Sequence, residues 1–184
     1  MVEGFIPASN RSSPAFLTTQ SIDMSPTASH HEINVRSASF LIAKRRGVCM
    51  RCSESMVLIA VALPRGHWML EPDAEVWEIA ALDAFTFYVD YLPDKVGARL
   101  QQFSPSYKLA YSHETSDTYW ANHCARCASL QSDHDLFCEP GGAFAPISES
   151  EAAEVELMEI EEPFEASVAG FAYQLELFEF MRRS

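Results

Sequence analysis

The chain lacks any apolar run as long as a membrane-spanning helix needs, about 18 residues or more. Its N-terminal stretch also lacks the basic start and long apolar segment of a secretory signal peptide. Both absences favour a cytoplasmic protein without a membrane partner. In that reducing compartment, paired cysteines are interpreted as metal or redox sites before they are interpreted as disulfides.

Sequence motifs of the common enzyme classes are missing as well. The chain contains no Gly-x-Ser-x-Gly, no His-Glu-x-x-His and no Gly-x-Gly-x-x-Gly. The glycine-containing turn at 139–142 lacks the Gly-Lys-Ser/Thr ending with which a P-loop holds phosphate. We therefore expect a protein that is not an enzyme.

Basic residues are scarce, since 13 Lys and Arg stand against 26 Asp and Glu for a formal charge of −13. Such a charge repels nucleic-acid phosphates at long range. Its distribution is uneven, because residues 149–165 hold eight Glu and no basic residue. Basic side chains gather instead near two cysteine pairs, and they are the candidate contacts to a phosphate or a partner: Lys44, Arg45, Arg46, Arg51 and Arg126.

Apolar residues are plentiful, which argues against a disordered chain. They make up 48% of the sequence and include 12 Phe, 6 Tyr and 3 Trp, enough to offset the entropy of ordering the chain. We expect 1–35, rich in Ser, Thr and Pro, to be irregular or flexible, with Phe5, Phe16 and Leu17 as candidate anchors. Residues 36–184 are expected to form a single domain.

Short apolar and alternating segments predict an α+β fold made mainly of antiparallel strands. The predicted strands lie at 38–43, 56–63, 77–82, 85–92, 107–111 and 171–177. Two short helices are expected. One spans 94–103, with Asp94 as its N-cap, and the other begins at the Ser-x-x-Glu capping box of Ser148. Most of 120–144 is expected to be loop.

Four of the five cysteines form two C-x-x-C pairs, Cys49 with Cys52 and Cys124 with Cys127. Two intervening residues let a tight turn aim both sulfur atoms at one point, and two such turns complete a tetrahedron of thiolates around Zn²⁺. The pairs therefore predict one structural zinc ion. Redox-active or disulfide-forming pairs are the alternative, although neither pair has the context of a thioredoxin-like site, where a helix opens after a strand.

Two features depart from a compact zinc ribbon. Seventy-one residues separate the pairs, and Ser53 and Ala128 stand where glycine commonly follows the second cysteine of a ribbon turn. A clip across so long a gap removes roughly 4 kcal/mol of unfolded-chain entropy. Structural zinc contributes about 10–16 kcal/mol in small peptides, which offsets that constraint.

Other polar residues near the second pair are given lesser roles. His123 is interpreted as a neighbour of the metal site or a surface residue, because four thiolates already complete a tetrahedron. Cys138 is interpreted as a leftover thiol in a loop or in the core. Asp133, His134 and Asp135 resemble an acid–base cluster, but sequence neighbours do not face one point by default, so a solvated turn is expected.

The two cysteine turns resemble a zinc ribbon split by a long insert. With the stretches at 119–127 and 139–144, they are similar to small uncharacterised bacterial proteins that carry such a ribbon, over about residues 40–165. The resemblance implies zinc at the four paired cysteines and no reaction. The favoured function is a zinc-binding interaction protein with a protein partner. The alternative is a nucleic-acid-binding ribbon that uses the basic turn at 44–51.

Overall fold

The computed structural model describes residues 32–71, 75–173 and 176–184. Most of the segment 1–35, including Phe5, Phe16 and Leu17, therefore lies outside the described residues. Its last residue, Val35, begins the first strand and is fully buried.

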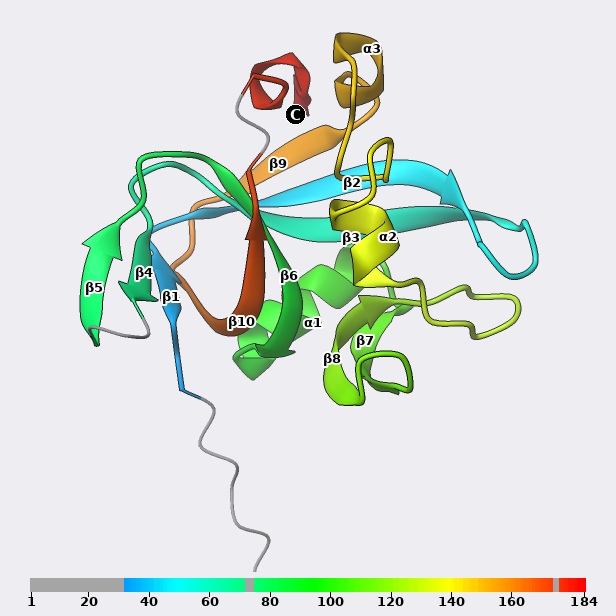
Figure 1. Ribbon diagram of the computed structural model, residues 1–184, viewed down its shortest axis with the longest axis horizontal. Helices are drawn as coiled ribbons and strands as arrows, with labels where there is room; N and C mark the ends of the chain where they lie inside the picture. The colour runs from blue at the N-terminus through cyan, green and yellow to red at the C-terminus, as the bar shows by residue number, and fades with distance from the viewer. Residues whose placement is uncertain (1–31, 72–74, 174–175) are drawn as a thin grey trace, which may run out of the picture. The chain divides into compact units, whose positions relative to one another are not determined.

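Antiparallel strands dominate the described part of the chain (Figure 1). The strands are β1 (Val35–Ser37), β2 (Phe40–Val48), β3 (Ser55–Leu63), β4 (Trp68–Glu71), β5 (Val76–Ile79), β6 (Ala84–Tyr91), β7 (Tyr107–Ser112), β8 (Asp117–Asn122), β9 (Glu156–Ile160), β10 (Phe164–Ala172) and β11 (Arg182–Arg183). The helices are α1 (Asp94–Phe103), α2 (Asp133–Phe137) and α3 (Glu149–Ala152), with a 3-10 turn η1 (Phe178–Phe180).

The strands follow the order β11-β9-β2-β3-β6-β10-β1-β4-β5, and the β7–β8 hairpin joins through β8 to β6. Neighbours pair antiparallel, with β11 and β9 as the parallel exception within the described residues. The predicted α+β class with mainly antiparallel strands is confirmed. The number of short helices is three rather than two.

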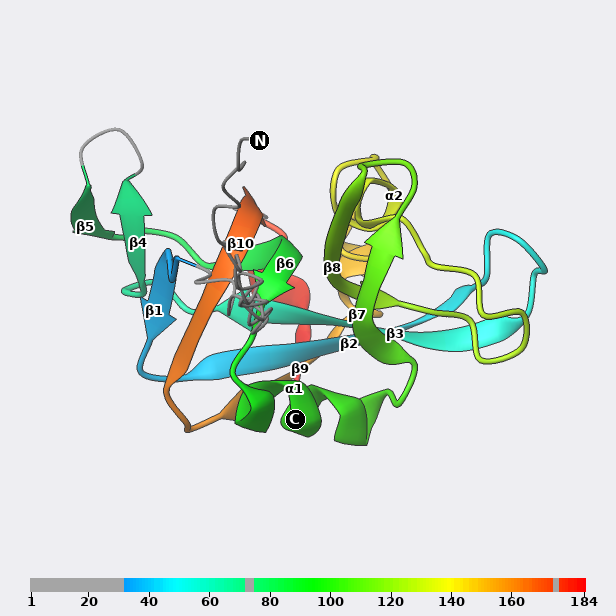
Figure 2. The same cartoon turned by 90° about the horizontal axis from the view of Figure 1, so that it is seen from below.

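The central strands are buried on both faces, which explains their continuous apolar sequences. On one face, Ile42 and Ile59 pack with Val96 and Leu100 of α1. On the other face, Leu41 packs in a cluster that α2, α3 and η1 also supply. Figures 1 and 2 show α1 on one side of β2 and β3 and α2 on the opposite side.

Aromatic side chains fix the segment that follows the second cysteine pair. Phe85 of β6 lies with its ring centroid 6.3 Å from Phe137, 5.5 Å from Phe144 and 5.7 Å from Phe178. Phe137 and Phe144 stack at 5.1 Å. Because these rings come from β6, α2, η1 and the loop after α2, their burial holds 133–144 against the sheet.

Several local predictions are corrected. The helix at 94–103 is present, but its N-cap is Pro93 and Asp94 lies in its first turn. The strand predicted at 171–177 instead occupies Phe164–Ala172, because pairing with β1 and β6 draws the earlier residues into the sheet. The segment 120–144 is mostly loop, as predicted, apart from the end of β8 and the helix α2.

Candidate metal centre

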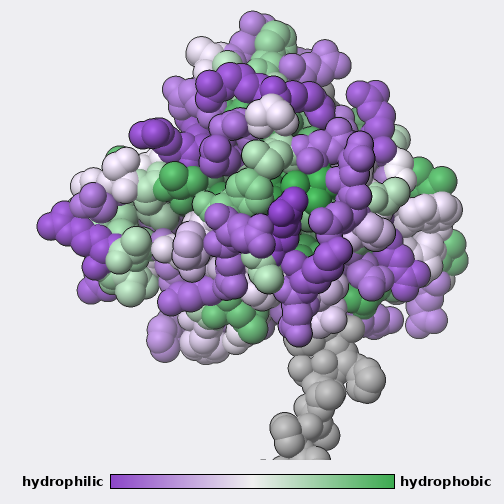
Figure 3. All heavy atoms as spheres, turned by 180° about the vertical axis from the view of Figure 1, so that it is seen from behind, coloured by the Kyte–Doolittle hydropathy of each residue, from purple (hydrophilic) through white to green (hydrophobic). Residues whose placement is uncertain are grey.

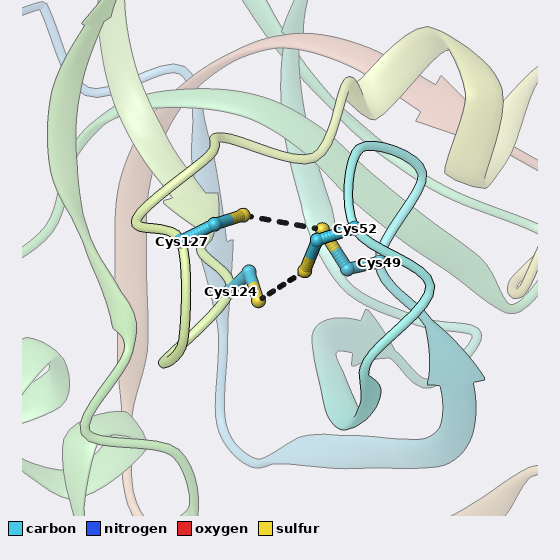
Figure 4. Close-up of side chains that lie close together, drawn as sticks. All are labelled: Cys49, Cys52, Cys124 and Cys127. Carbon is cyan, nitrogen blue, oxygen red and sulfur yellow. Dashed lines mark hydrogen bonds between the residues drawn. The ribbon is translucent and has the colours of Figure 1, made fainter.

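The first cysteine pair occupies the turn between β2 and β3. The backbone N–H of Cys49 donates to the carbonyl of Glu54 at 2.8 Å, and the N–H of Ser53 donates to the carbonyl of Cys49 at 2.8 Å. Ser53 closes the turn with a φ of 58°. These bonds form a turn in which both side chains of the pair point to the same side (Figure 4).

The second pair repeats this geometry in the loop after β8. The N–H of Cys124 donates to the carbonyl of Ser129 at 2.9 Å, and the N–H of Ala128 donates to the carbonyl of Cys124 at 2.9 Å. Ala128 has a φ of 57°. The two turns therefore share their hydrogen bonds and their left-handed closing residue, although they lie far apart in the sequence.

The two turns face each other and bring four sulfur atoms together (Figure 4). All four Sγ atoms lie within 4.8 Å of one another. The Sγ atoms of Cys49 and Cys127 are 3.6 Å apart, as are those of Cys52 and Cys124. Ligands at about 2.3 Å from a tetrahedral Zn²⁺ would be separated by about 3.8 Å. The tetrad thus suits a metal ion such as Zn²⁺.

The two 3.6 Å contacts run between the turns rather than within one C-x-x-C pair. Each turn therefore contributes one sulfur atom to each of the two contacts. All four cysteines are free thiols in the structure. Cys49 and Cys124 are buried, and Cys52 and Cys127 are half-buried, so the centre lies just below the surface.

Protonation of the sulfur atoms reflects their crowding. Burial alone raises the pKa of the Cys49 thiol, but backbone hydrogen bonds from Cys52 and Arg51 lower it to about 6. The backbone of Glu54 lowers the pKa of Cys52, whereas burial and the three neighbouring sulfur groups raise it to about 12. The raised pKa of Cys52 therefore disfavours the ionisation of both thiols of the first pair in the absence of a cation. A metal ion would displace the remaining protons, which makes its binding dependent on pH.

Gln131 joins both turns, and sequence reasoning missed it. Its side chain is buried; Oε1 accepts from the N–H of Met50 at 3.0 Å, while Nε2 donates to the carbonyl of Ser129 at 2.9 Å. The same Nε2 lies 3.6 Å from the Sγ of Cys49. A single glutamine near a cysteine pair carries no signal in the sequence, because its role depends on the approach of the two turns.

Three of the candidate cations are held in ion pairs. Lys44 lies 2.9 Å from Glu156, Arg45 lies 2.8 Å from Glu154, and Arg126 lies 2.8 Å from Glu54. The last pair links the second turn to the end of the first.

Arg45 is additionally bound by backbone oxygens. Its guanidinium donates to the carbonyls of Gly142 and Ala143 at 3.2 and 3.1 Å. Arg46 and Arg51 are exposed and make no ion pair with any described residue.

The remaining polar candidates lie outside the tetrad. His123 is buried, and its Nδ1 lies 2.9 Å from the carbonyl of Ala121. Burial lowers the pKa of His123 despite that contact, which favours the neutral ring. Cys138 is exposed and is not among the clustered sulfur atoms.

The solvated turn expected at 133–135 is wrong for Asp133, which is buried. Its Oδ2 accepts from the N–H of Tyr88 at 2.7 Å, and Tyr88 has a φ of 48° within β6. Burial raises the pKa of Asp133 to about 7, although the bond from Tyr88 acts to lower it. Folding of α2 against β6 removes this carboxyl from water, and the local sequence could not indicate that contact.

Two apolar side chains beside the first cysteine of the first turn are exposed at the surface. Val48 is 64% exposed and Met50 is 66% exposed, and they flank the buried Cys49. Elsewhere, Figure 3 shows a face on which hydrophobic residues form separate patches among hydrophilic ones. In the described part of the chain, no helix has the length and apolar character needed to cross a membrane.

Comparison of the chain with protein-family models, with curated proteins and with solved structures gives no match. The candidate metal site consists of two matched turns, four clustered sulfur atoms and a buried amide between them.

Proposed function

We propose that the chain is a zinc-binding interaction protein that binds a protein partner through the hairpin end, defined as Val48, Met50 and Arg51. The observation that carries the proposal is the exposure of Val48 and Met50 beside the four-cysteine cluster. With a metal ion bound, a turn anchored by two of the four metal bonds would present apolar side chains with little loss of backbone conformational entropy on binding. Apolar anchors with an adjacent arginine are common at protein interfaces.

The zinc ion is proposed to be structural. Four thiolates fill a tetrahedral site and leave no position for a reacting water or substrate, as a catalytic zinc requires. The residues that would hold it are Cys49, Cys52, Cys124 and Cys127, which the fold brings together. A reduced tetrad also requires a reducing compartment, so we propose a cytoplasmic location.

A protein partner is favoured over a nucleic acid by the charges. Lys44, Arg45 and Arg126 are engaged by carboxylates, so fewer cations are free to neutralise phosphates than the sequence suggests. The net charge of −13 adds long-range repulsion. Of the five candidate cations, only Arg46 and Arg51 remain unpaired among the described residues. Two positive charges would neutralise few phosphates of a nucleic acid.

The test is affinity capture from the native host with quantitative mass spectrometry. The bait variants are Val48→Ser/Met50→Ser and, as a matched control, Leu109→Ser/Tyr111→Ser, whose side chains are 48% and 54% exposed on β7. We expect the wild type and the control variant to capture the same partner proteins and the hairpin variant to lose them. The zinc content of all three baits should be the same. Equal capture by all three baits would contradict the proposal, and loss of capture on nuclease treatment would favour the nucleic-acid alternative.

A further inference from the structure

A groove separate from the hairpin end is lined by residues of β2, β3, β9 and β11 and by the two residues that follow α3. It has a volume of about 670 Å³. Its described lining consists of Lys44, Arg45, Arg46, Val57, Ala153, Glu154, Glu156 and Arg182. The volume falls within the usual range for small-ligand pockets, about 300–1,000 Å³.

Strand pairing places the groove's charges in a row. Lys44 of β2 is opposite Glu156 of β9, and Glu156 is opposite Arg182 of β11. Arg46, two residues after Lys44 on β2, projects from the same face of the sheet. The β-sheet thus holds one arginine on each side of the Lys44–Glu156 pair: Arg182 beside Glu156 and Arg46 beside Lys44.

The groove carries more positive than negative charge. Lys44 is paired with Glu156 and Arg45 with Glu154, whereas Arg46 and Arg182 make no ion pair with a described residue. The hydrogen bond from Lys44 lowers the pKa of Glu156, and the charge of Arg182 contributes to the same shift. Arg182 therefore acts electrostatically on the interior of the groove, and two positive charges remain unbalanced.

From this arrangement we propose that the groove binds a phosphate monoester, with Arg46 and Arg182 as its principal donors. Such a group carries about −1.5 to −2 charge at pH 7, which matches the unbalanced charge. Arginine presents paired N–H donors that fit phosphate oxygens. None of the described lining residues is aromatic, so the groove offers no platform for stacking a nucleobase.

The same phosphate chemistry could come from a free phosphorylated metabolite or from a phosphoserine on a protein. Calorimetric titrations at 150 mM salt would use glycerol 3-phosphate and a short phosphoserine peptide, each beside its unphosphorylated counterpart. We expect saturable binding of at least one phosphorylated probe and none of the counterparts. Binding of glycerol 3-phosphate identifies the free ester as sufficient, and binding of the peptide alone identifies the protein source.

Variants locate the site. Arg46→Gln/Arg182→Gln should weaken binding at least tenfold, and Arg46→Lys should weaken it less because the charge remains while the paired donors are lost. Lys108→Gln removes one charge from an exposed position on β7 and should leave affinity unchanged. Thermal melting and zinc content confirm that the variants are folded. Absence of saturable binding, or equal affinity in the double variant, would overturn the proposal.

Discussion

Ser53 and Ala128 show how single residues support the metal centre. Each follows the second cysteine of its pair and adopts a left-handed backbone, with φ of 58° and 57°. Glycine is commonly found at this place in zinc ribbons because it adopts that conformation without a Cβ clash. Both turns therefore adopt a left-handed backbone at this position without glycine.

Replacing Ala128 by glycine should stabilise the protein by roughly 0.5–1 kcal/mol. The relief of left-handed strain exceeds the entropy that glycine adds to the unfolded chain. Urea unfolding of zinc-loaded protein measures the effect. The matched control is Ala125→Gly, at an exposed position inside the same turn without positive φ, which should be neutral or destabilising. A loss of stability in Ala128→Gly would show that the left-handed backbone is not a source of strain.

Gln131 links the two cysteine turns through its side-chain amide. Gln131→Ala should weaken zinc binding by about tenfold or more, because partners that orient metal ligands typically contribute 10–100-fold to affinity. The variant also leaves the N–H of Met50 without its acceptor. Competition with a chromogenic chelator measures the affinity, and Gln101→Ala, on α1, serves as the control. Equal affinity in both variants would exclude a tuning role for Gln131.

At the scale of elements, Asp133 makes the contact between α2 and β6 sensitive to pH. Burial raises its pKa to about 7, so between about pH 4 and 7 the folded chain binds more protons than the unfolded chain. The stability contributed by protonated Asp133 is complete below about pH 4 and is lost as the pH rises through about 7.

Asp133→Asn should therefore reduce the loss of stability between pH 5 and pH 8. The amide keeps an oxygen acceptor for the N–H of Tyr88 but cannot ionise. Urea midpoints of wild type and variant at both pH values, with zinc in excess, give the comparison. Asp135→Asn, at a less buried position on the same helix, is the control. Identical pH dependence in wild type and Asp133→Asn would contradict the assignment.

The sequence predicted those elements whose signal is local. The apolar run at 56–63 and the helix at 94–103 correspond to β3 and α1, and the capping box at Ser148 begins α3. Ser148 Oγ accepts from the N–H of Glu151 at 3.3 Å, as the motif requires.

Elements with a long-range origin escaped prediction. β9 lies within the acidic stretch at 149–165, where alternation is weak, and it forms because β2 offers an unpaired edge. β1 and β11 have three and two residues, too few for a pattern. The short helix α2 depends on burial of Asp133 and Phe137 against β6, which no neighbouring residue specifies.

In the molecule as a whole, the four-cysteine cluster connects the β2–β3 hairpin to the loop between β8 and α2. The cysteine pattern predicted which residues meet, because C-x-x-C spacing is itself a local signal. The cysteine pattern could not predict that three nearby cations form ion pairs with glutamates. These pairs are Lys44–Glu156, Arg45–Glu154 and Arg126–Glu54. Those pairings required the sheet order.

The zinc content of protein purified without a histidine tag decides whether the four clustered cysteines hold a metal ion. We expect about one zinc per chain in the wild type, because four clustered thiolates complete one tetrahedral site. Cys138→Ser should retain that content, since Cys138 is exposed and outside the tetrad, whereas Cys124→Ser should lose it and melt at a lower temperature. A wild type without bound metal, or a Cys124→Ser variant with unchanged zinc and melting temperature, would contradict the account.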